Sequence, residues 1–399
     1  MIVWRRVRRL VACLVVVAGC WEEQRVDGVF SESEWEYLQT FRLDRLAPIT
    51  CSLGEARCDA IARFGQQLFF DPGYSGPLTV ASDKGPVGAA GKIACVHCHD
   101  PATYFADGRE DNAVSLGTAW TRRNVPSLVD LAYRKSFTWN DKYQKLEDVL
   151  ELALTSPAAL NVRDPGDSTL PMLSKEQRIV DHTLATYLPI YNSVFPPVAP
   201  GPQNYAPIYA NLALAIATYE AKLVSGPSPF DRYLAGDTTA IDDAAKRGAK
   251  LFIGKALCSE CHEGPLFADD KFHVTGVEQR GLHAPAVDQG RYEKTGNPDD
   301  DGRFRTPTLR HIAKTAPYMH AGQHETLAEV IDFYRWGGDA GGFSGKKDPR
   351  MVPLDITDDD ASDLEAFLLT LTGTPVDRMW TWNPVLVPVD RTTTPGIRP

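Results

Sequence analysis

Two short motifs of the form Cys-x-x-Cys-His lie far apart in this chain of 399 residues. Their cysteines and histidines are Cys95, Cys98, His99, Cys258, Cys261 and His262. Two cysteines three positions apart lie on one turn of chain, so both sulfurs can bond the two vinyl groups of a single haem. The adjacent histidine then faces the iron. The motifs therefore predict two covalently bound haem c groups, with His99 and His262 as the proximal iron ligands.

Other uses of paired cysteines fit these motifs less well. A zinc site built from two Cys-x-x-Cys pairs keeps the pairs about 15–20 residues apart. Here Cys95 and Cys258 are 163 positions apart. A thioredoxin-like pair lies beside a βαβ pattern, and the sequence shows no such pattern. We therefore interpret both motifs as haem attachment sites.

The first 20 residues resemble an export signal. Four arginines precede the apolar run from Leu10 to Ala18, which is shorter than the roughly 20 residues that span a bilayer as a helix. The small residues before Cys20 resemble a bacterial lipobox, whose cysteine is lipidated after cleavage. An ordinary cleaved signal with an incidental cysteine is the alternative. We expect a periplasmic protein with a lipid anchor at Cys20.

The charge balance excludes one class of partner, and the expected compartment suggests a crosslink. The chain has 42 basic and 52 acidic residues, a net charge of −10. A protein that binds a nucleic-acid backbone would carry a basic face instead, so we expect no nucleic-acid partner. Because export leads to an oxidising compartment, Cys51 and Cys58 could form a disulfide. Two free thiols remain the alternative.

The chain also repeats itself. The sequence from Gly65 to Phe69 before the first motif resembles that from Gly248 to Phe252 before the second. Downstream, matching residues recur at a constant offset of 181, as in Pro126 and Pro307. Such self-similarity suggests duplicated domains with one haem each. We predict a signal peptide over 1–20, haem domains over 21–232 and 233–385, and a tail over 386–399.

Apolar residues recur with the spacing of amphipathic helices. This pattern predicts helices over 146–154, 209–223, 244–253, 327–334 and 362–371. The fourth opens with a capping box from Thr326 to Glu329 and should stop at Gly337. No stretch shows sustained two-residue alternation. We therefore predict a mainly α fold, two cytochrome c-like domains with long loops, including loops over 281–302 and from 384.

The order of these motifs resembles the bacterial di-haem cytochrome c peroxidases and the related MauG-type enzymes. The matching segments include CVHCHDPATYFADG, SGPSPFDRYLAGD and FRTPTLRHIAKTAPYMHAGQHETLAEVIDFY, and they cover roughly residues 61–371. The resemblance implies a peroxidase-type oxidoreductase that uses hydrogen peroxide at an open first haem. Oxidising equivalents would then pass through the second haem to a small c-type cytochrome, another periplasmic redox protein or a protein substrate.

The resemblance also implies the remaining iron ligands. Tyr334 stands where MauG-type enzymes place a tyrosine on the second iron, with Met319 as a rival. Tyr334 could instead simply continue the apolar stripe of its helix. Thr118 occupies the position at which the peroxidases carry a histidine that caps the first iron. We therefore expect the first iron to be open. His182 lies in the same half of the chain, but nothing in the sequence assigns it to this iron.

Other family positions bear on the activity. Trp139 matches a tryptophan between the haems and would serve as an inter-haem relay, although a core tryptophan is the alternative. Val149 and Ala159 stand where the family has a glutamine and an acid–base glutamate, and neither can transfer a proton. Either another carboxylate acts, with Glu147, Glu151 and Asp164 as candidates, or peroxide turnover is slow. In the latter case the protein would be an electron-transfer or redox-sensing di-haem cytochrome.

The family also holds a calcium ion between its domains. Asn124, Thr315 and Pro317 match the positions that supply its oxygen ligands, which suit a hard cation. The alternative is that Asn124 only caps a turn.

Overall fold

The computed structural model describes residues 25–108, 114–141, 143, 145–162, 172–199 and 201–382. The expected signal peptide with Cys20, the tail over 386–399 and Asp164 lie outside this part of the chain. Among the helices of the described ranges, none combines the length and apolarity required to cross a bilayer.

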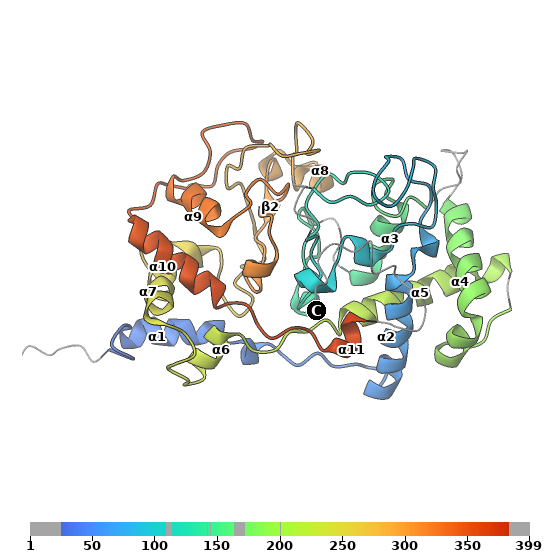
Figure 1. Cartoon of the computed structure of the whole chain (residues 1–399), viewed down its shortest axis with the longest axis horizontal. Helices are drawn as coiled ribbons and strands as arrows, with labels where there is room; N and C mark the ends of the chain where they lie inside the picture. The colour runs from blue at the N-terminus through green and yellow to red at the C-terminus, as the bar shows by residue number, and fades with distance from the viewer. Residues whose placement is uncertain are drawn as a thin grey trace, which may run out of the picture.

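The molecule is built mainly from helices, which confirms the predicted helical class, and Figure 1 shows them gathered in two halves. The first half contains α2 (Glu55–Phe70), α3 (Leu146–Thr155), α4 (Met172–Val194) and α5 (Tyr205–Glu220). The second contains α6 (Pro229–Leu234), α7 (Asp243–Ile253), α9 (Leu327–Arg335) and α10 (Asp358–Leu369). A two-stranded antiparallel sheet joins β1 (Phe272–His273) to β2 (Phe304–Arg305). The expected loop over 281–302 contains the short helix α8 (Tyr292–Thr295).

One helix pair forms the centre of each half. Helix α2 packs on α5, and α7 packs on α10. A Cβ atom at Gly65 would overlap the backbone carbonyl of Ala215, and one at Gly248 would overlap that of Asp363. The glycine of each repeated segment therefore marks the point at which its helix crosses a partner, because only a residue without a side chain allows such close approach.

A segment near each end of the described chain packs against the opposite half of the molecule. Phe30 and Phe41, which flank α1 (Glu32–Leu38), belong to the hydrophobic cluster of the second half. Trp380 in α11 (Arg378–Thr381) belongs to the cluster of the first half, where its carbonyl accepts a 2.7 Å hydrogen bond from Tyr219. In Figure 1, α1 accordingly lies beside α6 and α7, and α11 lies beside α5. The two hydrophobic clusters therefore exchange segments at both ends of the described chain, and the domain bounds stay a prediction.

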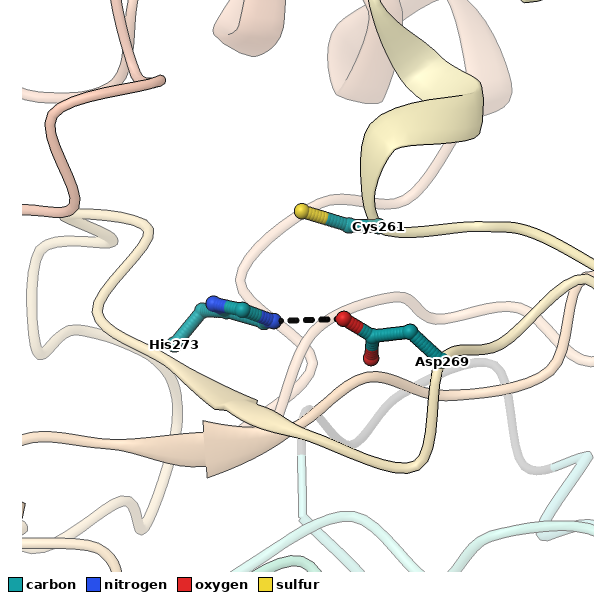
Figure 2. Close-up of side chains that lie close together, drawn as sticks. All are labelled: Cys261, Asp269 and His273. Atoms are coloured by element: carbon teal, nitrogen blue, oxygen red, sulfur yellow. Dashed lines mark hydrogen bonds and ion pairs between the residues drawn. The ribbon is translucent and has the colours of Figure 1, made fainter.

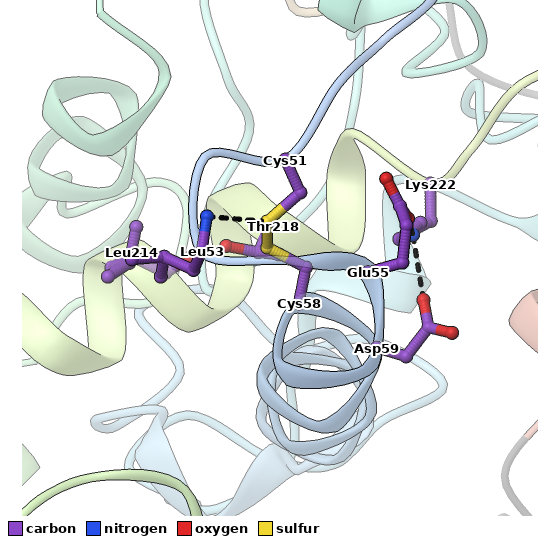
Figure 3. The surroundings of a disulfide bond; sticks show 8 residues. All are labelled: Cys51, Leu53, Glu55, Cys58, Asp59, Leu214, Thr218 and Lys222. Carbon is purple, nitrogen blue, oxygen red and sulfur yellow. Dashed lines mark hydrogen bonds and ion pairs between the residues drawn. A yellow bond between two sulfur atoms is a disulfide. The ribbon is translucent and has the colours of Figure 1, made fainter.

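A disulfide joins Cys51 to Cys58, which decides between the two alternatives left open by the sequence. The bridge ties the preceding loop to the first turns of α2, as Figure 3 shows. Next to it, the ammonium of Lys222 lies 2.7 Å from Asp59 and 3.2 Å from Glu55. These contacts hold the start of α2 against the end of α5.

Helix α9 begins at the capping box and ends before the two glycines, as the sequence predicts. The hydroxyl of Thr326 accepts a hydrogen bond from the backbone N–H of Glu329. In turn, the carboxylate of Glu329 accepts one from the backbone N–H of Thr326. The chain leaves the helix at Gly337 and Gly338, whose φ angles are +73° and +81°. Both are values that glycine adopts without strain. This helix carries Tyr334 in its last turn, so its ends determine where that side chain points.

Candidate haem centres

The two Cys-x-x-Cys-His motifs adopt the same local conformation. Each forms a short 3₁₀ turn, over Cys95–His97 in the first half and Cys258–Glu260 in the second. In each, the backbone N–H of the histidine donates to the carbonyl of the first cysteine at 2.9 Å. None of the four cysteines is in a disulfide. Both turns therefore keep two thiols and one imidazole close together.

The two histidine rings are oriented in the same way. Nδ1 of His99 lies 3.0 Å from the carbonyl oxygen of Phe105, and Nδ1 of His262 lies 2.8 Å from that of Phe267. Burial lowers the pKa of His99 to about 4 and also lowers the pKa of His262. Both rings are therefore neutral near pH 7, with the Nδ1–H group donating to the carbonyl. This leaves the Nε2 lone pair of each ring available to a metal ion.

A large cavity lies beside the second motif. Its empty volume is about 1350 Å³, and Cys258, Cys261 and His262 all line it. Apolar side chains supply most of the remaining wall, among them Phe252, Leu309, Val330, Ile331, Leu354, Ile356, Leu364 and Leu368. An apolar cavity that presents two thiols and one imidazole fits a porphyrin bound by thioether bonds and one axial histidine. These residues would hold the second haem.

Both candidates for the sixth ligand of this haem line the same cavity. Tyr334 reaches it from α9, and Met319 reaches it from a loop in which its φ angle is +69°. Within the described residues, the Tyr334 hydroxyl has no hydrogen-bond partner. At the constant offset of 181, the residue of α3 equivalent to Tyr334 is Ala153, which has no atom that could bind iron.

The segment that would cap the first iron is held against a neighbouring loop. The Thr118 hydroxyl donates to the carbonyl of Pro157 at 2.8 Å and lies 3.1 Å from that of Ala159. The backbone N–H of Thr118 also donates to the Ala159 carbonyl at 2.9 Å. Thr118 is fully buried, and its only side-chain oxygen is already used in these hydrogen bonds.

His182 is also engaged elsewhere. Its Nε2 lies 2.8 Å from a carboxylate oxygen of Asp71, and its ring meets that of Tyr74 edge to face. These contacts give His182 a structural role, and they assign it none at the first iron.

The structure describes only part of the set of candidates for proton transfer. Val149 and Ala159 are half-buried, and Glu147 is exposed. The side chain of Glu151 lies outside the described part of the structure. The sequence analysis missed Glu220, the last residue of α5, whose charge acts on Cys95 and whose pKa is raised to about 8 by burial. No motif marks this position, so only the packing reveals it.

Trp139 lies at the seam between the two halves. Its indole N–H donates to the backbone carbonyl of Asn124 at 2.8 Å, and its own carbonyl accepts from the N–H of Arg305 at 2.8 Å. Although Trp139 belongs to the first half of the chain, its side chain lines the cavity of the second haem.

The residues predicted to bind calcium are only partly together. The side-chain amide of Asn124 donates through Nδ2 to the carbonyl of Pro317 at 2.6 Å. Thr315, which would contribute its backbone carbonyl, lies two residues before Pro317 in the chain. Asn124 and Pro317 thus satisfy each other, and the calcium ion stays a prediction.

A cluster at the edge of the second cavity resembles a metal site. Cys261, Asp269 and His273 hold their potential ligand atoms within 4.8 Å of one another, and Figure 2 shows the three side chains converging. However, His273 lies 2.9 Å from Asp269 through Nε2 and 2.9 Å from Asp348 through Nδ1. Because the Cys261 sulfur belongs to the haem attachment motif, we interpret the rest of the cluster as an ion-pair network.

The chain is similar in sequence to known di-haem proteins. The family described as di-haem cytochrome c peroxidase matches residues 59–239. The chain is 32% identical over 339 residues to the cytochrome-c peroxidase IdrP1 of Denitromonas iodatirespirans, covering 78% of this chain and 81% of that protein. It is also 32% identical over 322 residues to the methylamine utilization protein MauG of Methylorubrum extorquens, covering 78% of each.

Solved structures show the same fold. A MauG-like protein associated with microbial copper homeostasis superimposes with a TM-score of 0.65 at 31% identity, over 84% of this chain and 94% of that one. The di-haem peroxidase BthA of Burkholderia thailandensis superimposes with a TM-score of 0.63 at 22% identity, over 79% and 86%. With its two haem motifs in matching turns, the chain belongs to the di-haem cytochrome c peroxidase and MauG family and is an oxidoreductase that uses two haem c groups.

Proposed function

We propose that this protein is an exported peroxidase-type oxidoreductase, anchored to a periplasmic membrane face through Cys20. Its first haem would be open to hydrogen peroxide, and its second would be closed by His262 and Tyr334. Oxidising equivalents would leave through the second haem to a protein electron donor or a protein substrate.

The single observation that carries this proposal is the position of Thr118. The segment from Gly117 to Ala119 bonds to the carbonyls of Pro157, Ala158 and Ala159. A Cβ atom at Gly117 would overlap Ala158, so the two segments are in direct contact. This packing supports a first iron that receives no sixth ligand from this segment, because its one side-chain oxygen is turned away.

The residues of the chain have distinct tasks in this proposal. When bound, the two haem c groups supply peroxide reduction and one-electron transfer. His99 and His262 would hold the irons through Nε2, because their Nδ1 atoms are bonded to carbonyls. Tyr334 offers a phenolic oxygen, a harder donor than the Met319 thioether, which would lower the reduction potential. Trp139 places an aromatic ring at the seam between the halves, where it would act as the relay.

The second cavity opens toward a surface on which a protein partner could dock. Leu257 and Val352 line the cavity and are also 39% and 44% exposed. The chain around Gly337 packs directly on Val352, and the neighbouring Trp336 is 68% exposed. Exposed apolar side chains gathered near a cofactor are typical of interaction sites. This surface supports a periplasmic redox protein, such as a small c-type cytochrome, as the partner.

Electron paramagnetic resonance of the oxidised protein at low temperature tests the coordination. We expect one high-spin haem for the open first site and one low-spin haem for the capped second site. Stopped-flow mixing with hydrogen peroxide should change the haem spectrum and then oxidise the protein donor. Two low-spin haems, or no reaction with peroxide, would contradict the proposal.

The anchor can be tested on its own. Cys20→Ser should release the exported protein from the membrane fraction without changing its haem content. Retention of the variant in the membrane would show that Cys20 is not the anchor.

A second candidate function is favoured by the residues at positions 149 and 159. Neither Val149 nor Ala159 can move a proton, and Glu147 is exposed. If Glu151, Asp164 and Glu220 do not transfer the proton either, cleavage of the peroxide O–O bond would be slow. In that case the protein would be an electron-transfer or redox-sensing di-haem cytochrome. It would show normal reduction and reoxidation with negligible peroxide turnover, which the same stopped-flow measurement distinguishes.

A further inference from the structure

One arginine in the wall of the second haem cavity has no acidic partner. Arg305 lines this cavity and is only 3% exposed. Its guanidinium donates to the backbone carbonyls of Thr138 at 3.3 Å and Thr306 at 3.1 Å. No carboxylate of the described residues forms an ion pair with it. By contrast Arg350, which lines the same cavity, pairs with Asp348 at 2.8 Å.

A second buried arginine, Arg134 in the first half of the chain, lies close enough to Arg305 for the two charges to interact. Arg134 is 7% exposed and donates to the carbonyls of Ser127 at 3.3 Å and Val129 at 2.9 Å. Its buried Nε atom has no hydrogen-bond partner. Burial, together with the positive charge of Arg305, lowers the pKa of Arg134 to about 9. Two like charges are thus held close together inside the protein.

Within the described residues, no carboxylate forms an ion pair with either arginine. Three carboxylates act on the two arginines from a distance, and each is closer to another basic side chain: Asp130 to His311, Asp270 to Lys135 and Asp141 to Arg291. A buried cation without a counter-ion is strongly destabilising. An additional anion at the Arg134–Arg305 pair would therefore stabilise the fold.

A haem c group carries such anions. Its two propionates lie on the edge of the ring opposite the two vinyl-derived thioethers, so they point away from Cys258 and Cys261. We propose that Arg305 pairs with a propionate of the second haem and that Arg134 supplies the second cation of the same site. A guanidinium matches a carboxylate with two parallel N–H···O bonds. This inference rests on the proposed attachment of a haem at Cys258 and Cys261.

The site also connects the haem to the relay. The guanidinium of Arg305 donates to the carbonyl of Thr138, and its backbone N–H donates to the carbonyl of the adjacent Trp139 at 2.8 Å. Arg305 therefore links the proposed propionate site to the segment that carries Trp139.

Resonance Raman spectroscopy tests the pairing, because the propionate bending bands report on hydrogen bonds to those carboxylates. In Arg305→Gln we expect these bands to shift. We also expect the midpoint potential of the second haem to fall in a spectroelectrochemical titration, because a nearby cation favours the reduced iron. Arg305→Lys keeps the charge and should restore most of the potential but not the bidentate band pattern. Both readouts are independent of peroxide turnover.

Arg123→Gln is the matched control, because Arg123 lies at the same seam but pairs with Asp288 at 2.6 Å. It should leave the propionate bands unchanged. If Arg305→Gln does not assemble with two haems, Arg134→Gln provides the same test from the other side of the seam. Unchanged bands and potentials in a fully loaded variant would overturn the proposal. So would a potential that follows the chloride concentration while the bands stay constant, since a free anion would then occupy the site.

Discussion

Asp130 and His311 stand 181 positions apart, the offset of the internal repeat, and their side chains meet in the seam between the halves. Nε2 of His311 lies 3.1 Å from a carboxylate oxygen of Asp130, and both residues are almost completely buried. Both also adopt left-handed backbone, with φ angles of +59° and +64°. Two equivalent positions of the repeat thus contact each other where the two halves join.

This pair should make the protein sensitive to acid. Burial alone would raise the pKa of Asp130, but hydrogen bonds from His311 and Ser225 outweigh burial and lower it. A carboxyl group with a lowered pKa stabilises the fold above its unfolded pKa of about 3.9. That contribution is lost as the pH falls from there through the folded value. Denaturation measured from pH 7 to pH 3 should show this loss.

Asp130→Asn isolates the charge, because asparagine tolerates left-handed backbone. We expect it to lower the free energy of unfolding by about 1.5–3 kcal/mol at pH 7, the range for a hydrogen bond to a charged group. It should also flatten the pH dependence below pH 4. Asp355→Asn, at an exposed position, is the control and should change neither. An unaltered pH profile in Asp130→Asn would show that other carboxylates dominate.

The two candidate ligands of the second iron can be separated by substitution. Tyr334→Phe should abolish any phenolate-to-iron charge-transfer band and raise the potential of the second haem, because a hard anionic donor is lost. Met319→Leu should leave both unchanged. Absorption and electron paramagnetic resonance spectra of the oxidised variants provide the measurement. The reverse pattern would assign the iron to Met319 and leave Tyr334 as a packing residue.

Peroxide turnover should respond to a carboxylate at position 159. Ala159→Glu restores the family residue and should raise the rate of peroxide consumption by roughly a hundredfold, the lower end of general acid–base effects. Ala158→Glu adds the same charge one residue earlier, where the side chain leaves the backbone in a different direction, and should have little effect. Equal rates in Ala159→Glu and the wild type would mean that proton transfer does not limit turnover.

The relay role of Trp139 predicts a defect in communication between the haems. Trp139→Phe keeps an aromatic ring but loses the hydrogen bond to Asn124, at a cost of about 1 kcal/mol in stability. After rapid reduction of one haem, electron exchange with the other should be slower than in the wild type. Rates that match the wild type at unchanged coordination would identify Trp139 as a core residue only.

The exposed surface near the second haem predicts a partner-specific effect. Trp336→Ala should weaken the complex with a protein donor by about 2 kcal/mol, roughly thirty-fold in affinity, if Trp336 is a central contact. Oxidation of a small-molecule reductant should not change. Leu369→Ala removes another exposed apolar side chain, 51% exposed, and serves as the control. Equal affinities for the two variants would place the docking surface elsewhere.

The sequence by itself determined the features whose chemistry is local. Five contiguous residues define each haem attachment site, because thioether bonds and the axial histidine need a single turn of chain. Helix α9 was predictable because the Thr326–Glu329 capping box and its apolar period act within a few turns. The resemblance to the family then added Tyr334 and the loss of a ligand at Thr118, which spacing alone does not reveal.

Only the tertiary structure decided the contacts that join distant positions. It turned the Thr118 hydroxyl toward Pro157 and placed Trp139 in the wall of the second cavity. It brought Arg134 close to Arg305, with no ion-pair partner for either among the described residues. It also carried α1 and α11 across to the opposite halves. Such contacts have no fixed separation along the chain, since they depend on how the two halves pack against each other, and so no pattern in the sequence encodes them.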